Sequence, residues 1–347
     1  MKRTAYIILS IAVLAGCSKP ALISEQKITM TAGISDIEVS SKAGDDPASA
    51  NEYSGTVPTN EKPLNAAVWF SYSSTVFSST PTDDVYLLPC HTTMQFTSSA
   101  KTYARIEGKD LKYPIPTAGN ETVSSVYSVG FHPNSGWDVT DNTEKGAKHV
   151  ISGSEDLMFA DIIEGKWNDP FPAQNYKHLL TWVKINVCAT TPETAVQWGN
   201  VTDVWISSKE NVEVQFGYNT EENKGISTVS YTGNEQYIRT FSGDSPLGLV
   251  SQQVGSVFCS PSDSYTIRIK TENMTNPKEI RNIRVETIET EDVTEAVSEE
   301  DYLPAEQLRG KLVIINLYFQ PYDIVEGTCS LYYWNNKNED LYLEEVN

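Results

Sequence analysis

The stretch Lys27–Ile34, written KITMTAGI, alternates between apolar and small polar residues along its whole length. Its apolar positions are Ile28, Met30, Ala32 and Ile34. Successive side chains of a β-strand point to opposite faces of a sheet, so these four side chains share one face. The alternation predicts a half-buried strand close to the N-terminus, with these four residues pointing into a core.

Strand-like runs recur along the rest of the chain, separated by turn residues at intervals of about 8–12 residues. β-branched and aromatic residues dominate these runs, as is typical of strands. They predict strands at 66–72, 85–88, 92–97, 102–107, 123–131, 179–189, 200–207, 212–218, 225–232, 254–259, 264–271, 278–289, 311–319 and 328–334. Helical periodicity is limited to short candidates at 304–308 and 292–300. The pattern predicts an all-β fold of two tandem sandwiches, joined near residues 190–199.

The N-terminus has the pattern of a bacterial lipoprotein signal. Lys2 and Arg3 precede the apolar run Tyr6–Val13, which is too short to span a bilayer as a mature helix. The small residues of Leu14–Cys17 (LAGC) then lead directly to a cysteine, as in a lipobox. This predicts a signal peptide at 1–16 and acylation, with palmitate or a similar chain, at Cys17. The alternative is an ordinary secretory signal with an incidental cysteine.

The net charge limits the kinds of partner. The whole chain of 347 residues carries −20, and loss of the 16-residue signal removes two positive charges, leaving 331 residues with −22. A chain this acidic repels nucleic acid and anionic membrane surfaces. Nucleic-acid binding is therefore not expected, and acyl chains on Cys17 are the expected membrane attachment, at an outer membrane or cell surface.

Catalytic and metal-binding patterns are missing from the sequence. The four histidines have no metal-ligand spacing, and there is no nucleophile elbow, P-loop or dinucleotide fingerprint. We therefore expect no enzyme activity, no cofactor and no metal site. Cys90, Cys188, Cys259 and Cys329 lie far apart in the sequence, so they are either buried free thiols or one of three possible disulfide pairings.

Several segments together resemble the fimbrillin family, the pilus subunits of Bacteroides-type bacteria. The first is Leu111–Pro133, with Tyr113–Pro114 and a strand ending in His132–Pro133. The second is Asp156–Ala160 (DLMFA), and the third runs from Phe171 through His178–Leu180 to Val183–Ile185. With the lipobox, they cover roughly residues 14–190, while the C-terminal half matches only in length and strand content. The same resemblance favours a packed, hydrogen-bonded role for His178.

The resemblance implies two transthyretin-like β-sandwich domains, at 43–192 and 193–347, behind a lipidated segment at 17–42. It also implies a fimbrial subunit that is assembled with other pilin subunits by strand exchange and contributes to adhesion. In that scheme a trypsin-like protease removes the first strand, here Lys27–Ile34, and a strand from a neighbouring subunit fills the groove.

The expected cleavage lies between Lys42 and Ala43, where the family often has an arginine. The lysine implies a protease that tolerates it; alternatively, Lys42 is an ordinary loop lysine. The weakly alternating Leu341–Val346 is the candidate donor strand. Without a donor strand, the chain would be a tip or anchor subunit. An outer-surface glycan-binding lipoprotein with exposed aromatic residues is a further alternative, and the adhesion receptor is left open.

Overall fold

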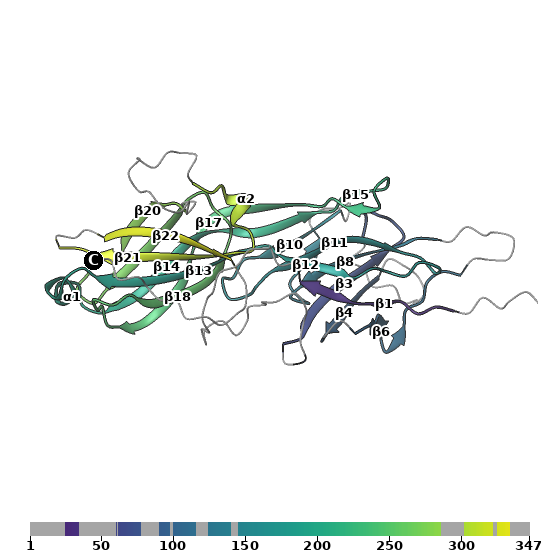
Figure 1. Ribbon diagram of the computed structural model, residues 1–347, viewed down its shortest axis with the longest axis horizontal. Helices are drawn as coiled ribbons and strands as arrows, with labels where there is room; N and C mark the ends of the chain where they lie inside the picture. Colours follow the sequence, from purple (N-terminus) through teal and green to yellow (C-terminus); the bar gives the residue numbers. More distant parts are fainter. Residues whose placement is uncertain are drawn as a thin grey trace, which may run out of the picture.

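The computed structural model describes residues 25–34, 60, 62–77, 90–97, 100–115, 124–139, 145–285, 302–321 and 325–333. Strands make up 59% of this described part and helices 5%, so the prediction of an all-β fold is confirmed. The strands form three larger sheets and three two-stranded ones, and the molecule is elongated (Figure 1). None of the helices in the described part of the chain has the length and apolar character needed to span a bilayer.

The first sheet has six strands in the order β2-β12-β11-β8-β3-β4. Its strands are β2 (Ala32–Ile34), β3 (Leu64–Ser71), β4 (Cys90–Phe96), β8 (Val126–His132), β11 (Met158–Gly165) and β12 (Gln174–His178). Smaller strands lie close by in the same half of the molecule: β1 (Thr29–Met30), β5 (Thr102–Tyr103), β6 (Arg105–Ile106) and β7 (Lys109–Asp110). β1 pairs with β5, and β6 pairs with β7.

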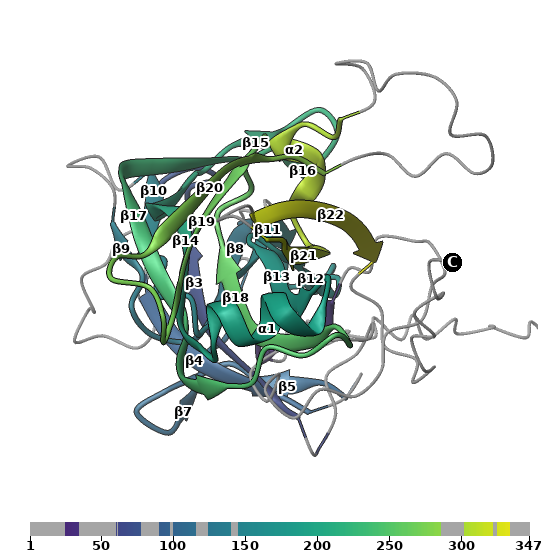
Figure 2. The same cartoon turned by 90° about the vertical axis from the view of Figure 1, so that its left-hand side faces the viewer.

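The second sheet runs β20-β19-β14-β10-β9, with β17 also paired to β14. Its strands are β9 (Asp138–Val139), β10 (Gly146–Val150), β14 (Val201–Gln215), β17 (Thr228–Ser245), β19 (Tyr265–Thr271) and β20 (Lys278–Ile283). The third sheet has the order β18-β13-β21-β22, with β13 (Thr181–Ala189), β18 (Gln252–Cys259), β21 (Lys311–Phe319) and β22 (Val325–Tyr333). Figure 2 shows these two sheets facing each other in the C-terminal half. The remaining pair is β15 (Tyr218–Asn219) with β16 (Lys224–Gly225).

The long β14–β17 hairpin connects the two halves of the molecule. Val201–Ile206 pair with β19 in the C-terminal half, whereas Asn211–Gln215 pair with β10, which precedes the expected joint at 190–199. β13 likewise pairs with the C-terminal strands β18 and β21, although it lies before residue 192. Strand pairing thus crosses the expected boundary in both directions. The division into domains 43–192 and 193–347 stays a prediction.

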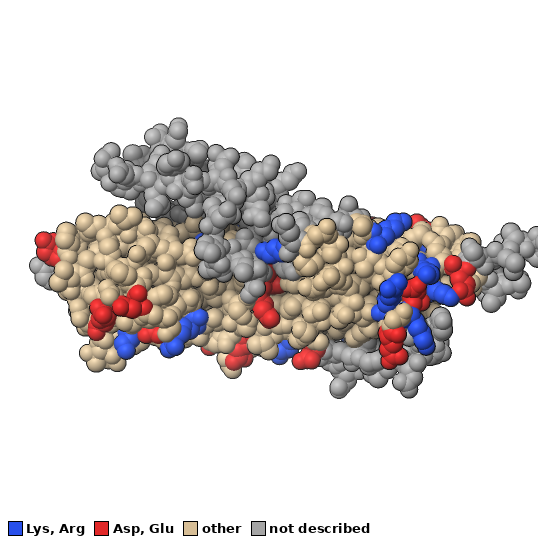
Figure 3. Space-filling view, turned by 90° about the horizontal axis from the view of Figure 1, so that it is seen from below, with Lys and Arg blue, Asp and Glu red and all other residues tan. Residues whose placement is uncertain are grey.

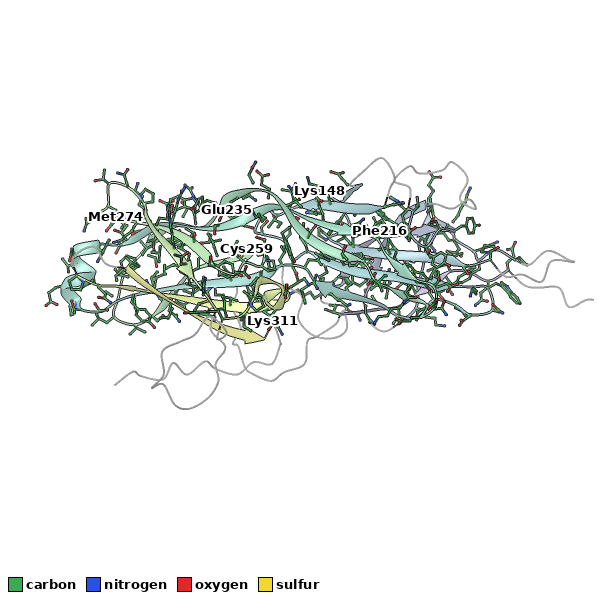
Figure 4. The ribbon with its side chains drawn as sticks, turned by 90° about the horizontal axis from the view of Figure 1, so that it is seen from above. Lys148, Phe216, Glu235, Cys259, Met274 and Lys311 are labelled. Carbon is green, nitrogen blue, oxygen red and sulfur yellow. The ribbon has the colours of Figure 1, made fainter. Side chains whose placement is uncertain are left out.

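Two hydrophobic clusters fill the interior. One contains alternate residues of β3 (Leu64, Ala66, Val68 and Phe70) together with the N-terminal strand. The other begins with the remaining core residues of β3, Ala67 and Trp69, and extends to Phe319 in the C-terminal half. Phe216, directly after β14, reaches the N-terminal half, where its ring lies 6.1 Å from Trp69 and 5.3 Å from Phe77 (Figure 4). β3, in the interior of the first sheet, is therefore buried on both faces.

Two short helices complete the described structure. α1 (Pro192–Trp198) begins after Thr191, whose hydroxyl oxygen accepts a hydrogen bond from the backbone N–H of Thr194. That contact is a typical N-terminal cap, and proline at the first position suits a helix start. α2 (Ala305–Leu308) lies where the sequence predicts the 304–308 helix. The predicted 85–88 strand and 292–300 helix lie outside the described residues.

Gly130 provides space inside the first sheet, which leads to a prediction. A Cβ at Gly130 would lie 2.3 Å from the Tyr176 hydroxyl and 2.8 Å from Gln174 Oε1. We expect Gly130→Ala to lower the free energy of unfolding by about 1–3 kcal/mol, because the buried tyrosine must move. Gly248→Ala is the matched control, since its Cβ would meet nothing closer than 3.9 Å. Urea unfolding of both variants checks this, and equal stabilities would contradict it.

Candidate functional site

The N-terminal strand places its apolar face inside the protein. Ile28 and Met30 are each 1% exposed, and Ala32 and Ile34 are each 4% exposed. The residues between them are half-buried, which gives the two-residue period that the sequence indicates. All four side chains belong to the cluster that fills the N-terminal half. Burial alone does not decide whether this strand can be removed, because its backbone hydrogen bonds must also be broken.

The N-terminal strand is bonded along the edges of its neighbours. Ile28 N–H donates to the Leu111 carbonyl (2.8 Å), and Ile28 carbonyl accepts from Ala104 N–H (3.1 Å). β2 then pairs in parallel with β12, and Gln174 N–H donates to the Thr31 carbonyl (2.8 Å). β2 is the outermost strand of the first sheet. Its departure would therefore break no pairing between the five other strands of that sheet.

The groove beneath this strand is apolar. We define the groove by the buried residues that share a cluster with the strand: Leu64, Ala66, Val68, Phe70, Cys90, Met94, Phe96, Ala104, Leu111, Tyr113, Val126, Met158, Ala160, Phe171 and Tyr176. Burying Ile28, Met30 and Ile34 against them contributes about 5–9 kcal/mol in all, at roughly 1.5–3 kcal/mol for each large side chain. Loss of the strand would expose an apolar floor beside unpaired backbone groups, a combination that promotes association.

The two tyrosine hydroxyls of the groove are hydrogen-bonded within the protein. The Tyr113 hydroxyl oxygen accepts a hydrogen bond from Phe171 N–H (2.9 Å), and burial raises the pKa of Tyr113 to about 12. The Tyr176 hydroxyl donates to Gln174 Oε1 (3.1 Å), and burial raises the Tyr176 pKa as well. Both tyrosines are neutral at physiological pH. These phenols consequently place no charge in the groove.

Charged residues hold the start of the strand at the surface. Lys27 Nζ lies 2.6 Å from Asp110 Oδ2, Arg105 Nε lies 2.6 Å from Asp110 Oδ1, and Lys112 pairs with Glu25. Hydrogen bonds from Lys27 and Arg105 lower the pKa of Asp110. Acidic and basic side chains gather at this end of the molecule in Figure 3. Such exposed pairs are screened by solvent and salt, so they position the strand more than they stabilise it.

The structure brings together two segments that resemble the family motifs. Asp156–Ala160 leads into β11, His178 ends β12, and Met158 is the cross-strand partner of His178. His178 Nδ1 lies 2.9 Å from Asp156 Oδ2, and their side chains are 5% and 0% exposed. The expectation that His178 is packed and hydrogen-bonded is confirmed. His132, at the end of β8, is also buried, and its Nδ1 lies 2.7 Å from the Asn65 carbonyl oxygen. Burial lowers the pKa of His132.

The buried Asp156–His178 contact gives a second prediction. His178→Ala removes a buried hydrogen bond to a carboxyl group and leaves space in the core. We expect the free energy of unfolding to fall by about 2–3 kcal/mol, measured by urea denaturation. Lys177→Ala, at the neighbouring exposed position of β12, is the control and should change stability by less than about 0.5 kcal/mol. Similar losses for both variants would contradict a structural role for the pair.

Other predicted sites fall partly outside the described residues. Cys17, Lys42, Ala43 and Leu341–Val346 lie outside them, so lipidation, cleavage and the donor strand stay predictions. Cys90, Cys188 and Cys259 are buried free thiols, and Cys329 is a half-buried one. Burial raises the pKa of Cys90 to about 12 and also raises those of Cys188 and Cys259. Within the described ranges, no three His, Cys, Asp or Glu side chains come together as metal ligands would.

Sequence reasoning missed part of the groove. Gln174 and Tyr176 support the N-terminal strand from β12, but the segment Gln174–His178 alternates without an apolar face that a pattern could detect. Its inward positions are Gln174, Tyr176 and His178, two of which are polar. Buried and exposed positions nevertheless alternate regularly along this segment, with the buried Phe171 before it and the buried Leu179 after it.

No family model matches the chain, and a search of curated proteins gives no match. The chain is similar to solved structures of two putative cell adhesion proteins. The protein from Bacteroides uniformis is 14% identical to this chain, the match covers 89% of this chain and 98% of that protein, and the TM-score is 0.46. That from Bacteroides ovatus is 11% identical, covers 91% and 100%, and has a TM-score of 0.47. The fimbrial anchor protein Mfa2 from Porphyromonas gingivalis is 10% identical, covers 90% and 98%, and has a TM-score of 0.40.

Proposed function

We propose that the chain is a structural fimbrial subunit whose functional site is the groove now filled by Lys27–Ile34. One observation carries this proposal: the strand buries four alternate side chains in the groove, yet it is bonded only at the edges of its neighbours. A strand from another subunit with the same alternation can make the same backbone bonds and fill the same positions. Assembly in this form requires no enzyme activity, and it places the protein at the cell surface.

Removal of the strand requires a cut between Ile34 and β3. Lys42 followed by Ala43 is the proposed position, because it lies after the strand and before the first residues of β3. Cleavage there would free the strand together with the proposed lipid anchor at Cys17, since both lie upstream. The subunit would then depend on its neighbours for attachment to the outer membrane. A tip or anchor subunit would use the same groove without donating a strand of its own.

Limited proteolysis with size-exclusion chromatography tests the proposal. Trypsin under native conditions should cut the full chain at Lys42 first and give ladders or larger assemblies. Lys42→Gln is the matched control and should delay both the cut and the assembly. A cut protein that stays monomeric with the fragment bound would overturn strand exchange. In that case a tip or anchor subunit, or a glycan-binding lipoprotein, becomes the better interpretation.

The proposed anchor makes a separate prediction. Cys17→Ala should move the protein from the membrane fraction to the soluble fraction, or leave it as an uncut precursor, because acyl chains supply the membrane affinity. The readout is fractionation of the producing cells, with Cys329→Ala as a control that removes a different thiol. Unchanged membrane fractionation of the Cys17 variant would argue against a lipoprotein.

A further inference from the structure

A cavity of about 400 Å³ lies beside the first sheet, away from the groove. One wall comes from β3 and β4 and includes Trp69, His91 and Thr93; the other is the turn from Asn134 to Trp137. The volume falls within the range of about 300–1,000 Å³ that small-molecule sites occupy. Trp69 belongs to the cluster that reaches the C-terminal half, whereas its neighbours Val68 and Phe70 face the groove. The cavity and the groove therefore lie on opposite faces of the same sheet.

The sheet wall presents rings and a hydroxyl. Trp69 and His91 are cross-strand partners whose rings stack at 4.1 Å with 5° between their planes. Thr93 lies two residues further along β4 on the same face, opposite Ala67, and is exposed. β4 is the last strand of the first sheet. Trp69 itself is only 3% exposed, so the groups that this wall offers to a ligand are the half-buried His91 ring and the exposed Thr93 hydroxyl.

The turn that forms the other wall is held in place before any ligand arrives. Trp137 Nε1–H donates to the Pro133 carbonyl (3.1 Å), and its ring packs 4.7 Å from Phe131. His149 Nε2 lies 3.2 Å from the Ser135 carbonyl oxygen. Gly136 has φ +82°, and a Cβ there would meet His149 Nε2 at 2.5 Å, so glycine suits this position. A turn fixed in this way loses little entropy on binding.

The polar side chains of the turn are available. Asn134 and Ser135 are exposed, and their side chains make no hydrogen bond to other residues in the described ranges. Their amide and hydroxyl groups can both donate and accept. Trp137 is half-buried, and since its indole N–H is used within the turn, it offers the ring itself to a ligand. The turn supplies directional polar groups next to an apolar ring.

The composition of the cavity selects the class of ligand. The chain carries −20 overall, yet among the residues that the structure describes no Asp, Glu, Lys or Arg lines this cavity. A charged ligand would find no counter-ion there, whereas a neutral polyhydroxyl ring matches the hydroxyl and amide groups and can lay its C–H face on an indole. The described part of the lining also has no carboxylate pair, which glycoside hydrolysis generally needs. We propose that this cavity binds a neutral saccharide unit of a glycan without cleaving it.

This binding is independent of strand exchange, because the N-terminal strand lies on the other face of the sheet. The test uses the full chain with its N-terminal strand in place. A printed array of neutral and acidic oligosaccharides identifies a bound sugar, and calorimetry with that sugar then measures its affinity. We expect retention of at least one neutral oligosaccharide. Retention of acidic oligosaccharides alone, or of none, would overturn the proposal.

Variants link binding to the cavity. Asn134→Ala and Thr93→Ala change exposed side chains and should each weaken binding about three- to tenfold, the worth of one hydrogen bond. Trp137→Ala should weaken it more than tenfold, and its thermal unfolding must be compared with that of the parent protein because the ring also packs in the core. Asn234→Ala, an exposed asparagine of β17 outside the cavity lining, is the matched control. Undiminished affinity in Asn134→Ala and Thr93→Ala would place the sugar elsewhere and refute the assignment.

Discussion

A chain that begins at Ala43 is expected to associate into large assemblies at concentrations where the full-length chain remains a single species. The physical reason is the loss of Ile28, Met30 and Ile34 from the groove, about 5–9 kcal/mol of apolar burial. The backbone groups that Thr31 and Ile28 now satisfy on β12 and on residues 104 and 111 also become open. Such an edge pairs readily with a strand of another molecule. Analytical ultracentrifugation of the two chains measures the difference.

A peptide of residues 25–34, added during refolding, should return the shortened chain to a single species. It restores the backbone bonds and the four buried side chains without a covalent link. The matched control is a peptide of the same length in which Met30 and Ile34 are both aspartate. That peptide keeps the backbone groups but cannot fill the groove, so assemblies should persist. Assembly that is insensitive to either peptide would show that another surface causes it, and the groove would lose its proposed role.

The N-terminal strand could be predicted well because its physics is local. The burial of Ile28, Met30, Ala32 and Ile34 follows from strict alternation, which needs no knowledge of the partner strands. The partners themselves are distant: residues 102–113 on one side and 174–176 on the other. Alternation specifies a face but carries no information about which strand lies beside it. The parallel pairing of β2 with β12 therefore became evident only in three dimensions.

Among the strands that the sequence analysis missed, β11 and β12 were missed for identifiable reasons. In β11 the pairing register shifts between Ala160 and Ile163, and this irregularity interrupts the two-residue period of the sequence. In β12, polar side chains occupy inward positions, where Gln174 Oε1 accepts from Tyr176 and His178 is bonded to Asp156. Patterns of apolar residues detect neither case, because both depend on contacts with other strands.

The opposite error occurred at β14, where two predicted strands form one. Between them lies a polar stretch that a pattern interprets as a turn, yet Ser208 is only 3% exposed. Ser208 Oγ and Ser260 Oγ lie 3.3 Å apart, and each accepts a backbone N–H, from Ser260 and Lys209 respectively. These bonds allow buried serines to continue a strand. They span some fifty residues of sequence, so only the fold reveals them. The proposed glycan-binding cavity could not be predicted from the sequence for the same reason, because its lining joins β4 to a turn after β8.

A single charge on the inner face of the N-terminal strand should have the largest effect of any substitution described for this protein. Met30 is 1% exposed, and Met30→Asp removes its core contacts, worth about 2–5 kcal/mol, and buries a carboxyl group at a further cost of several kcal/mol. The N-terminal half should unfold in much less urea than the parent protein. Burial would raise the pKa of the new carboxyl, so the penalty should be greatest at neutral pH and shrink as the pH falls towards about 4.

Thr29→Asp, one residue away on the half-exposed face, should cost less than about 1 kcal/mol, and Met30→Leu less than about 1.5 kcal/mol. Urea unfolding at two pH values distinguishes these outcomes, and equal effects at positions 29 and 30 would contradict the assignment of the inner face.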